Sequence, residues 1–242
     1  MDEKAYILKE KSTICILIYI LICFALVPII YMSITKIFFD GNTNYLTQAI
    51  LNLISYGGMA ITFIILLKNY LFDDLIGFKK NWLICIIITI SLIILIKLSD
   101  AFCSWFYKLF NETINGNNQQ SVIDNIKENA VIMAFSTCLF APIVEEIIYR
   151  KCIFAYFKKD LYAILTSTLC FALVHVFSSL DFIHILPYLI TGALFSVAYF
   201  LSKRNIYVTI LAHIAVNTIS FIVIPIWKKR LQTSFILLYF FY

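Results

Sequence analysis

The stretch that decides the fold and the site is Phe140-Ala141-Pro142-Ile143-Val144-Glu145-Glu146-Ile147-Ile148-Tyr149-Arg150. It places two adjacent carboxylates and an arginine inside an otherwise apolar run. Ionisable side chains are costly within a membrane, so such a cluster indicates a functional site. The alternative is a helix that reaches the membrane interface, where Arg150 extends to the headgroups and pairs with the glutamates. Two further polar patches, later in the chain, favour the functional interpretation.

The composition of the chain indicates a membrane protein. Its 242 residues are 62% hydrophobic and 14% charged, whereas a soluble domain is about half apolar and about a quarter charged. We therefore expect an all-α, polytopic membrane bundle of seven to eight transmembrane helices, forming one membrane domain over residues 1–242. The seven cysteines contain no CxxC pair and fall mostly in apolar runs, which favours buried thiols over metal or disulfide roles.

Apolar runs of about 20 residues, the length that crosses a bilayer, give the expected spans. They cover residues 12–35, 45–67, 81–107, 130 onward through the glutamates, 161–180, 182–202 and 205–227. Between them we expect a charged loop over 68–80 and a polar loop over 111–129, with room for a short amphipathic helix from Val122. The apolar tail 231–242 is too short to span and suits the membrane interface.

The positive charges predict the orientation. With the N-terminus inside, twelve of the 19 lysines and arginines face the cytoplasm, so the positive-inside rule predicts a cytoplasmic N-terminus in a cell membrane. The cluster at 228–230 is an exception to this pattern. The net charge of +5 says little about nucleic acid, because the cations lie between apolar runs, where they act as topology signals. We expect the lipid bilayer, and no nucleic acid, as a partner. The bias toward Ile, Lys and Asn hints at a bacterial source.

Three polar patches interrupt the apolar runs at helical spacing. They are Glu145-Glu146-x-x-x-Arg150, Phe171-x-x-x-His175 and His213-x-x-x-Asn217. Glu145 lies 14 residues before Lys159 and His175 lies 16 residues after it. In two antiparallel helices joined there, both would lie about 21–24 Å from the turn, so we expect them side by side. His213 and Asn217 lie shallower, at about 12–18 Å from Asn205, a difference that tilt or a kink at Pro142 would close.

Helical geometry predicts different roles for the two glutamates. Glu146 and Arg150 are four residues apart, the favourable order for an ion pair. Glu145 points about 100° away and has no evident cation, so burial favours it as a general base. Glu145 and His175 would then activate a water, while His213 and Asn217 would donate to an oxyanion. His184, near Asp181, is expected to be interfacial and without a role.

The pattern EExxxR, FxxxH and HxxxN resembles the CPBP family, which contains CAAX proteases and bacteriocin-processing or immunity proteins. The resemblance covers about residues 130–220, the expected catalytic core, and includes Thr191-Gly192. It implies an intramembrane endopeptidase with no cofactor, in which Glu145 activates water with help from His175. His213 and Asn217 would be oxyanion donors, with Glu146, Arg150 and Phe171 in support. Lys151 stands where the family commonly has glycine, which bears on local packing.

Three alternatives remain open at this stage. A zinc protease would use Glu145, His175 and His213 as ligands, although no HExxH motif is present. A self-immunity protein would bind a bacteriocin or its receptor without cleaving it. A transporter would use the buried Glu and His side chains as a proton path, but it should show broken helices or paired repeats. The expected substrate is a membrane-associated peptide or protein, and the sequence does not indicate whether it carries a lipid.

Overall fold

The computed structural model describes residues 3–110, 116–177 and 180–230, with side chains up to residue 223 except that of Asn118. These residues form helices and no strand, and seven helices are long and apolar enough to span a membrane. The expected all-α membrane bundle is therefore confirmed. The elements are α1 (Glu3–Leu21), η1 (Ile22–Leu26), α2 (Val27–Phe38), α3 (Tyr45–Lys80), α4 (Trp82–Lys108), α5 (Asn117–Phe135), η2 (Ser136–Phe140), α6 (Ala141–Glu146), η3 (Ile147–Cys152), α7 (Asp160–Phe177), η4 (Phe182–His184), α8 (Ile185–Leu201) and α9 (Ile206–Arg230).

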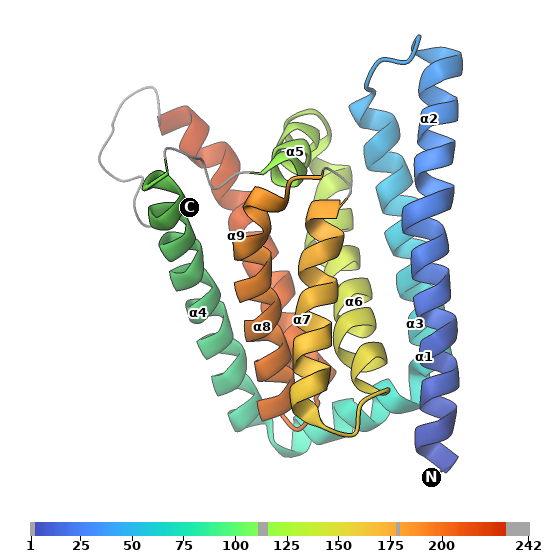
Figure 1. Ribbon diagram of the computed structural model, residues 1–242, viewed down its shortest axis with the longest axis vertical. Helices are drawn as coiled ribbons and strands as arrows, with labels where there is room; N and C mark the ends of the chain where they lie inside the picture. The colour runs from blue at the N-terminus through green and yellow to red at the C-terminus, as the bar shows by residue number, and fades with distance from the viewer. Residues whose placement is uncertain (1–2, 111–115, 178–179, 231–242) are drawn as a thin grey trace.

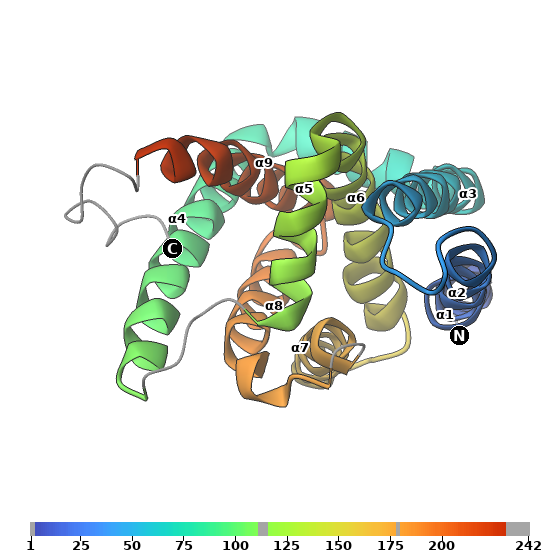
Figure 2. The ribbon, with the colours of Figure 1, turned by 90° about the horizontal axis from the view of Figure 1, so that it is seen from above.

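The helices α6 to α9 form the centre of the bundle, with α1–α3 on one side and α4 on the other (Figure 1, Figure 2). The described chain begins at the end where α3 meets α4, α6 meets α7 and α8 meets α9 (Figure 1). We call this end the N-terminal end. At the opposite end α5 lies across the bundle (Figure 2). There Asp181 accepts hydrogen bonds from His184 and from the backbone of Asn117, and these bonds, with that of His184 first, lower the pKa of Asp181.

Two expected loops differ from the structure. The prediction of a charged loop over 68–80 is wrong, because α3 continues without a break to Lys80, and Asn81 caps it. That segment holds no proline, and its two final lysines favour the negative end of a helix dipole. In the polar loop, residues 111–115 lie outside the described part of the chain. The helix α5 begins at Asn117, and Asn129 breaks it with non-helical dihedral angles. The expected tail 231–242 is also outside the described residues.

Each of two prolines follows a wide π turn. Pro28 comes after η1, and Pro142 comes after η2. Proline has no N–H, and its ring clashes with the carbonyl four residues earlier in an α-helix. A π turn adds one residue to the helical turn and so relieves that clash. The third π turn, η3, contains no proline and directly follows the glutamates. It widens the helix next to the candidate site.

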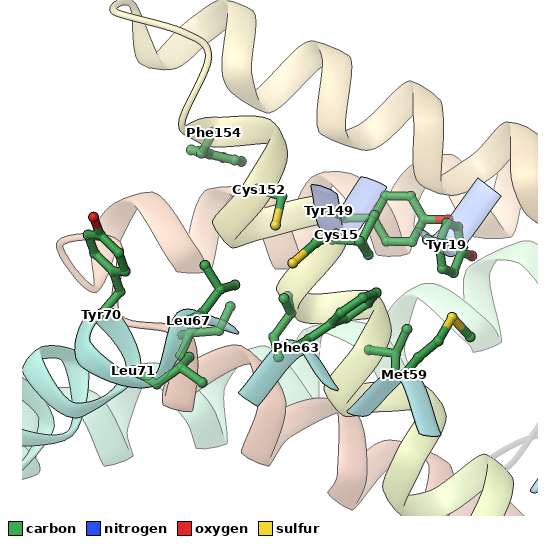
Figure 3. Packing of buried hydrophobic residues seen from close by; sticks show 14 of the residues in the cluster. Cys15, Tyr19, Met59, Phe63, Leu67, Tyr70, Leu71, Tyr149, Cys152 and Phe154 are labelled. Carbon is green, nitrogen blue, oxygen red and sulfur yellow. Dashed lines mark hydrogen bonds between the residues drawn. The ribbon is translucent and has the colours of Figure 1, made fainter. Parts of the chain in front are cut away.

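The largest core cluster surrounds η3. It packs α1 and α3 against Tyr149 and Cys152 of η3, and Figure 3 shows Cys15 facing Cys152 while Phe63 and Met59 fill the space beside them. All of these side chains are almost fully buried. The segment that carries the two glutamates is therefore held on one side by the first two spans, which lie outside the stretch that carries the motifs.

Candidate functional site

The second glutamate is fully buried between a cation and an imidazole. Arg150 Nη1 lies 3.2 Å from Glu146 Oε1, and both side chains are 0% exposed, which is the ion pair that the sequence predicts. The same oxygen accepts a hydrogen bond from His213 Nδ1 over 2.8 Å. This second contact could not be predicted from the sequence, because Glu146 and His213 lie 67 residues apart in the chain. Glu146 therefore holds both Arg150 and His213.

Aromatic rings cover the guanidinium of Arg150. Its central carbon lies 4.8 Å from the ring centre of Phe171 and 5.0 Å from that of Phe195, and Nη2 lies 3.4 Å from the carbonyl of Gly192. A guanidinium over an aromatic face is attracted to the ring's negative face. This gives a physical reason for an aromatic residue one helical turn before His175: the ring of Phe171 covers Arg150.

The first glutamate lies between the two histidines. Glu145 Oε2 is 4.0 Å from His175 Nε2 and 3.9 Å from His213 Nε2. Glu145 and His213 are each about one-tenth exposed, and His175 is 19% exposed. Three of the four predicted catalytic residues thus converge from α6, α7 and α9. The two glutamates point in different directions, as their spacing predicts: Glu146 faces Arg150, and both glutamates contact His213, at opposite nitrogens of its ring.

The expected difference in depth disappears because the helix carrying Glu145 ends early. That helix stops at Phe154, and α7 begins only at Asp160. Glu145 is therefore nine residues, or about 13 Å, from its helix end. His213 is seven residues, or about 10 Å, from the start of α9 at Ile206. The intervening segment descends to α7 (Figure 1), so the two side chains meet at similar depth.

The hydrogen bonds of the histidines determine which nitrogen faces Glu145. His175 Nδ1 lies 2.7 Å from the carbonyl oxygen of Phe171, and a carbonyl only accepts, so Nδ1 must carry the proton. His213 Nδ1 likewise donates to the carboxylate of Glu146. In the neutral form, each histidine then presents an unprotonated Nε2 toward Glu145. In that tautomer, both rings accept a hydrogen bond at Nε2.

Aromatic rings on α8 fix both imidazoles. Tyr188 stacks on His175 at 4.7 Å and 26°, and Phe195 packs on His213 at 4.8 Å. Neither residue was among the predicted site residues. Their spacing of seven residues puts them on one face of α8, two turns apart. That spacing, around Gly192, is the signal that would have found them.

Asn217 contacts the backbone of η2. Its Nδ2 donates to the carbonyl of Thr137 over 2.9 Å. The N–H of Ala141 donates to the carbonyl of Ser136, five residues back, and the next residue in that register, Pro142, has no N–H to give to Thr137. Asn217 supplies the donor that the proline lacks. An amide nitrogen has two protons, so one remains for another acceptor.

The spacing of the three nitrogen and oxygen atoms suits a water better than a metal ion. Ligands on a tetrahedral zinc lie about 3.3 Å apart, closer than the 3.9 and 4.0 Å measured here. Among the described residues, no three His, Cys, Asp or Glu side chains are placed to hold a metal. A water about 2.8 Å from two atoms spans a gap of about 4 Å at a right angle. The donor set itself, two imidazoles and a carboxylate, is chemically suited to zinc.

Comparison with known proteins supports the resemblance drawn from the three motifs. Residues 127–219 match the family model described as type II CAAX prenyl endopeptidase Rce1-like, and this segment contains every candidate site residue. The chain is 34% identical over 134 residues to the Bacillus subtilis protein named "Putative membrane peptidase YdiL", covering 49% of this chain and 52% of that protein.

A second relative extends the likeness to another bacterial group. The chain is 36% identical over 94 residues to an uncharacterized protein of Mycoplasma capricolum, covering 39% of this chain and 28% of that protein. The chain thus spans about half or less of the length of these two relatives. No solved structure matches the chain.

Proposed function

We propose that this protein is an intramembrane endopeptidase that hydrolyses a peptide bond in a membrane-associated protein or peptide. The observation that carries the proposal is the position of Glu145 Oε2, 4.0 and 3.9 Å from the Nε2 atoms of His175 and His213. A carboxylate and the Nε2 atoms of two imidazoles converge there at a gap that suits one water. The family match and the name of the Bacillus subtilis relative support the same reaction class.

Glu145 is the general base in this mechanism. It takes a proton from a water held between its Oε2 and Nε2 of His175, and the water oxygen attacks the scissile carbonyl carbon. His175 orients that water, while its own ring is fixed by the bond to Phe171 and by the stacked Tyr188. Glu145 then returns the proton to the leaving amine, so that proton uptake and release balance.

His213 and Asn217 are the proposed donors to the oxyanion. Because Nδ1 of His213 is committed to Glu146, Nε2 donates only when the ring is protonated. Asn217 has one amide proton beyond the one given to Thr137. Each such donor contributes about 10²–10³-fold to the rate of acyl transfer reactions.

The membrane setting defines the class of substrate. The helix of Glu145 ends nine residues later, at Phe154, at the N-terminal end of the bundle. Glu145 therefore lies about 13 Å inside that end, and the scissile bond must enter the bundle from the membrane or its surface. We infer a cytoplasmic N-terminus from the positive charges around residues 4–11, 79–80, 158–159 and 203–204. The bias of the composition toward Ile, Lys and Asn supports a bacterial cell membrane. On that orientation the site opens toward the cytoplasmic side, and the bilayer and the substrate are its partners.

The test compares membrane peptides from cells that express the wild type, Glu145→Gln or Glu128→Gln. Glu128 is an exposed glutamate on α5 and serves as the matched control. A peptide whose cleaved form disappears only in Glu145→Gln identifies the substrate, and the purified protein should then cut it. If Glu145→Gln keeps full biological activity at normal abundance, the protein acts by binding, as an immunity protein would.

A zinc-dependent protease is the second candidate. Both histidines carry their proton on Nδ1, which points away from Glu145, so both Nε2 lone pairs lie beside its carboxylate. Glu145, His175 and His213 would hold the ion, as a histidine–glutamate set holds catalytic zinc. Bound zinc would supply a more acidic water. The contacts of His213 with Glu146 and of His175 with Phe171 would then orient the ligands.

A further inference from the structure

A second buried ion pair lies at the N-terminal end of the bundle, outside the site described above. Lys151 Nζ is 2.6 Å from Asp74 Oδ2, and the two side chains are only 9% and 14% exposed. Lys151 belongs to η3, directly after Arg150, and Asp74 belongs to the last part of α3. Two charges this well buried remain favourable only when they stay paired, so this contact fixes α3 against η3.

The same aspartate also holds the start of α9. The backbone N–H of Ile206, the first residue of α9, donates to Asp74 Oδ2 over 3.3 Å. Asn205 donates from Nδ2 to the backbone carbonyl of Asp74 over 2.6 Å and accepts from the N–H of Tyr207. A carboxylate at a helix N-terminus interacts favourably with the helix dipole. Asp74 is thus shared between η3 and α9, and Lys151 balances its charge.

Polar contacts at two levels, which we call ties, therefore join the helical segment α6–η3 to α9. Near the site, Glu146 of α6 bonds His213 of α9. Toward the N-terminal end, Lys151 of η3 reaches the first residue of α9 through Asp74. The ties are five residues apart on one helix and seven on the other, or about 8 and 10 Å. Two fixed points a short distance apart set the register of α9 against the segment that carries both glutamates.

We propose that Lys151 and Asp74 are positioning residues that set the distance between Glu145 and His213. Neither touches the reacting atoms. Without the pair, α9 keeps its deeper bonds, from His213 to Glu146 and from Asn217 to Thr137, and the bond from Asn205 to the backbone of Asp74. Its start is no longer anchored to η3 and can shift along it, so the 3.9 Å separation of Glu145 and His213 is less well fixed. Because a misplacement of about 1 Å lowers rates by about 10²-fold, the loss should appear mainly in turnover. The activity part of this proposal rests on the proposed endopeptidase function.

The matched control is the ion pair of Asp73, the neighbour of Asp74 on α3, with Lys4 of α1. Lys4 Nζ lies 2.7 Å from Asp73 Oδ2, with side chains 63% and 50% exposed. Exposed pairs of this kind contribute little to stability, and this one joins α1 to α3. The variants are Lys151→Met with Asp74→Asn, made singly and together, and Lys4→Met with Asp73→Asn. The double variant at Lys151 and Asp74 leaves no unpaired buried charge, so it should fold even where a single variant does not.

The first readout needs no substrate. The chain has three histidines, so nitrogen NMR of histidine-labelled protein in detergent resolves His213, His175 and His184. Replacing both Lys151 and Asp74 should weaken the Nδ1–H signal of the His213–Glu146 hydrogen bond. The signal of His184, which bonds Asp181 at the other end, should stay unchanged. An unaltered His213 signal in a folded double variant overturns the proposal, whatever the fate of the proposed function.

The second readout is cleavage. The double variant should lose about 10-fold or more in kcat with KM changed by less than about 2-fold, because alignment and not substrate affinity is lost. Lys151→Arg, which keeps the charge, should recover most of kcat, and the Lys4–Asp73 variants should match the wild type. Equal losses in both pairs, or a loss in KM alone, would overturn the positioning role. If the NMR shift occurs in a protein for which no substrate is cleaved, the positioning holds and the endopeptidase function fails.

Discussion

His213 donates a hydrogen bond from Nδ1 to Glu146 Oε1 over 2.8 Å, and Arg150 Nη1 lies 3.2 Å from the same oxygen. One fully buried carboxylate oxygen thus holds both an imidazole and a guanidinium. The adjacent Glu145 turns about 100° away and faces Nε2 of the same His213. The two glutamates therefore contact opposite sides of one ring, and their replacement should have different consequences.

Glu145→Gln should abolish cleavage while leaving the melting temperature near that of the wild type. The amide keeps the shape of the side chain but accepts no proton, so loss of the general base should cost about 10²–10⁴-fold in kcat. A neutral amide is also less costly to bury than a carboxylate. The measurement is cleavage of the identified peptide, beside thermal unfolding in detergent. Normal cleavage by Glu145→Gln would show that another group is the base.

Glu146→Gln should mainly destabilise the protein. It leaves Arg150 fully buried without its charge partner, and breaking a buried pair costs about 3–5 kcal/mol. Arg150→Gln should behave in the same way, because it leaves Glu146 as the uncompensated charge. Both are measured by chemical or thermal unfolding in detergent. A Glu146→Gln protein that is as stable as the wild type but inactive would instead give Glu146 a direct catalytic role.

Prolonged chelation should leave cleavage intact. The gaps of 3.9 and 4.0 Å around Glu145 Oε2 are wider than the separation of about 3.3 Å between ligands on zinc. The measurement is the cleavage rate after dialysis against a strong chelator, with metal content determined on the same sample. A matched sample receives added zinc. Activity that disappears with the chelator and returns with zinc alone would establish the metalloprotease.

The sequence predicts the parts of the site that depend on spacing along one helix. The i,i+4 pair of Glu146 and Arg150 and the different direction of Glu145 both follow from 3.6 residues per turn. Seven spans follow from runs long enough to cross a bilayer. The convergence of Glu145 with His175 was predicted from similar residue counts to Lys159, but residues 155–159 are not helical, so the helical distances behind that prediction do not hold.

Contacts that depend on packing between distant helices could not be predicted. The bonds from His213 to Glu146 and from Lys151 to Asp74 join residues 67 and 77 apart, and no local pattern specifies them. The helical continuation of α3 to Lys80 was missed because charge was taken as a sign of a loop, although charged residues favour helices as readily as they favour loops.

Gly192→Ala should destabilise the bundle and slow cleavage. A Cβ at Gly192 would lie 3.1 Å from Phe171 Cδ1 and 3.2 Å from the carbonyl oxygen of Thr168, so α7 and α8 must separate. Overpacking of this kind costs about 1–3 kcal/mol. Phe171 covers Arg150 and its carbonyl holds His175, so a shift of Phe171 should also lower kcat.

Gly58→Ala is the control for that substitution. Nothing lies within 4 Å of the Cβ position at Gly58, which is also inside a helix. Replacing a helical glycine by alanine stabilises by about 0.5–1 kcal/mol where space allows. Thermal unfolding should therefore show a lower melting temperature for Gly192→Ala and a higher one for Gly58→Ala, and cleavage should slow only in Gly192→Ala. Equal effects at both positions would mean that helix propensity, and not the close approach of α7 and α8, decides the outcome at Gly192.

A double-mutant cycle tests whether Asn217 compensates for Pro142. Asn217→Ala removes the donor to the carbonyl of Thr137, and a buried acceptor left without a partner costs about 1–3 kcal/mol. Pro142→Ala restores a backbone N–H in the register that the π turn assigns to that carbonyl. In the Pro142→Ala background, Asn217→Ala should therefore cost clearly less, with a coupling of about 0.5–3 kcal/mol.

The same cycle separates the structural and catalytic parts of Asn217. If its second amide proton serves the oxyanion, the double variant should regain stability but stay about 10²–10³-fold slow. Unfolding free energies and kcat are measured on the four proteins of the cycle. Additive stability effects would show that Asn217 does not replace the missing N–H of Pro142. A double variant that is both stable and fully active would remove Asn217 from the oxyanion site and leave His213 as its sole proposed donor.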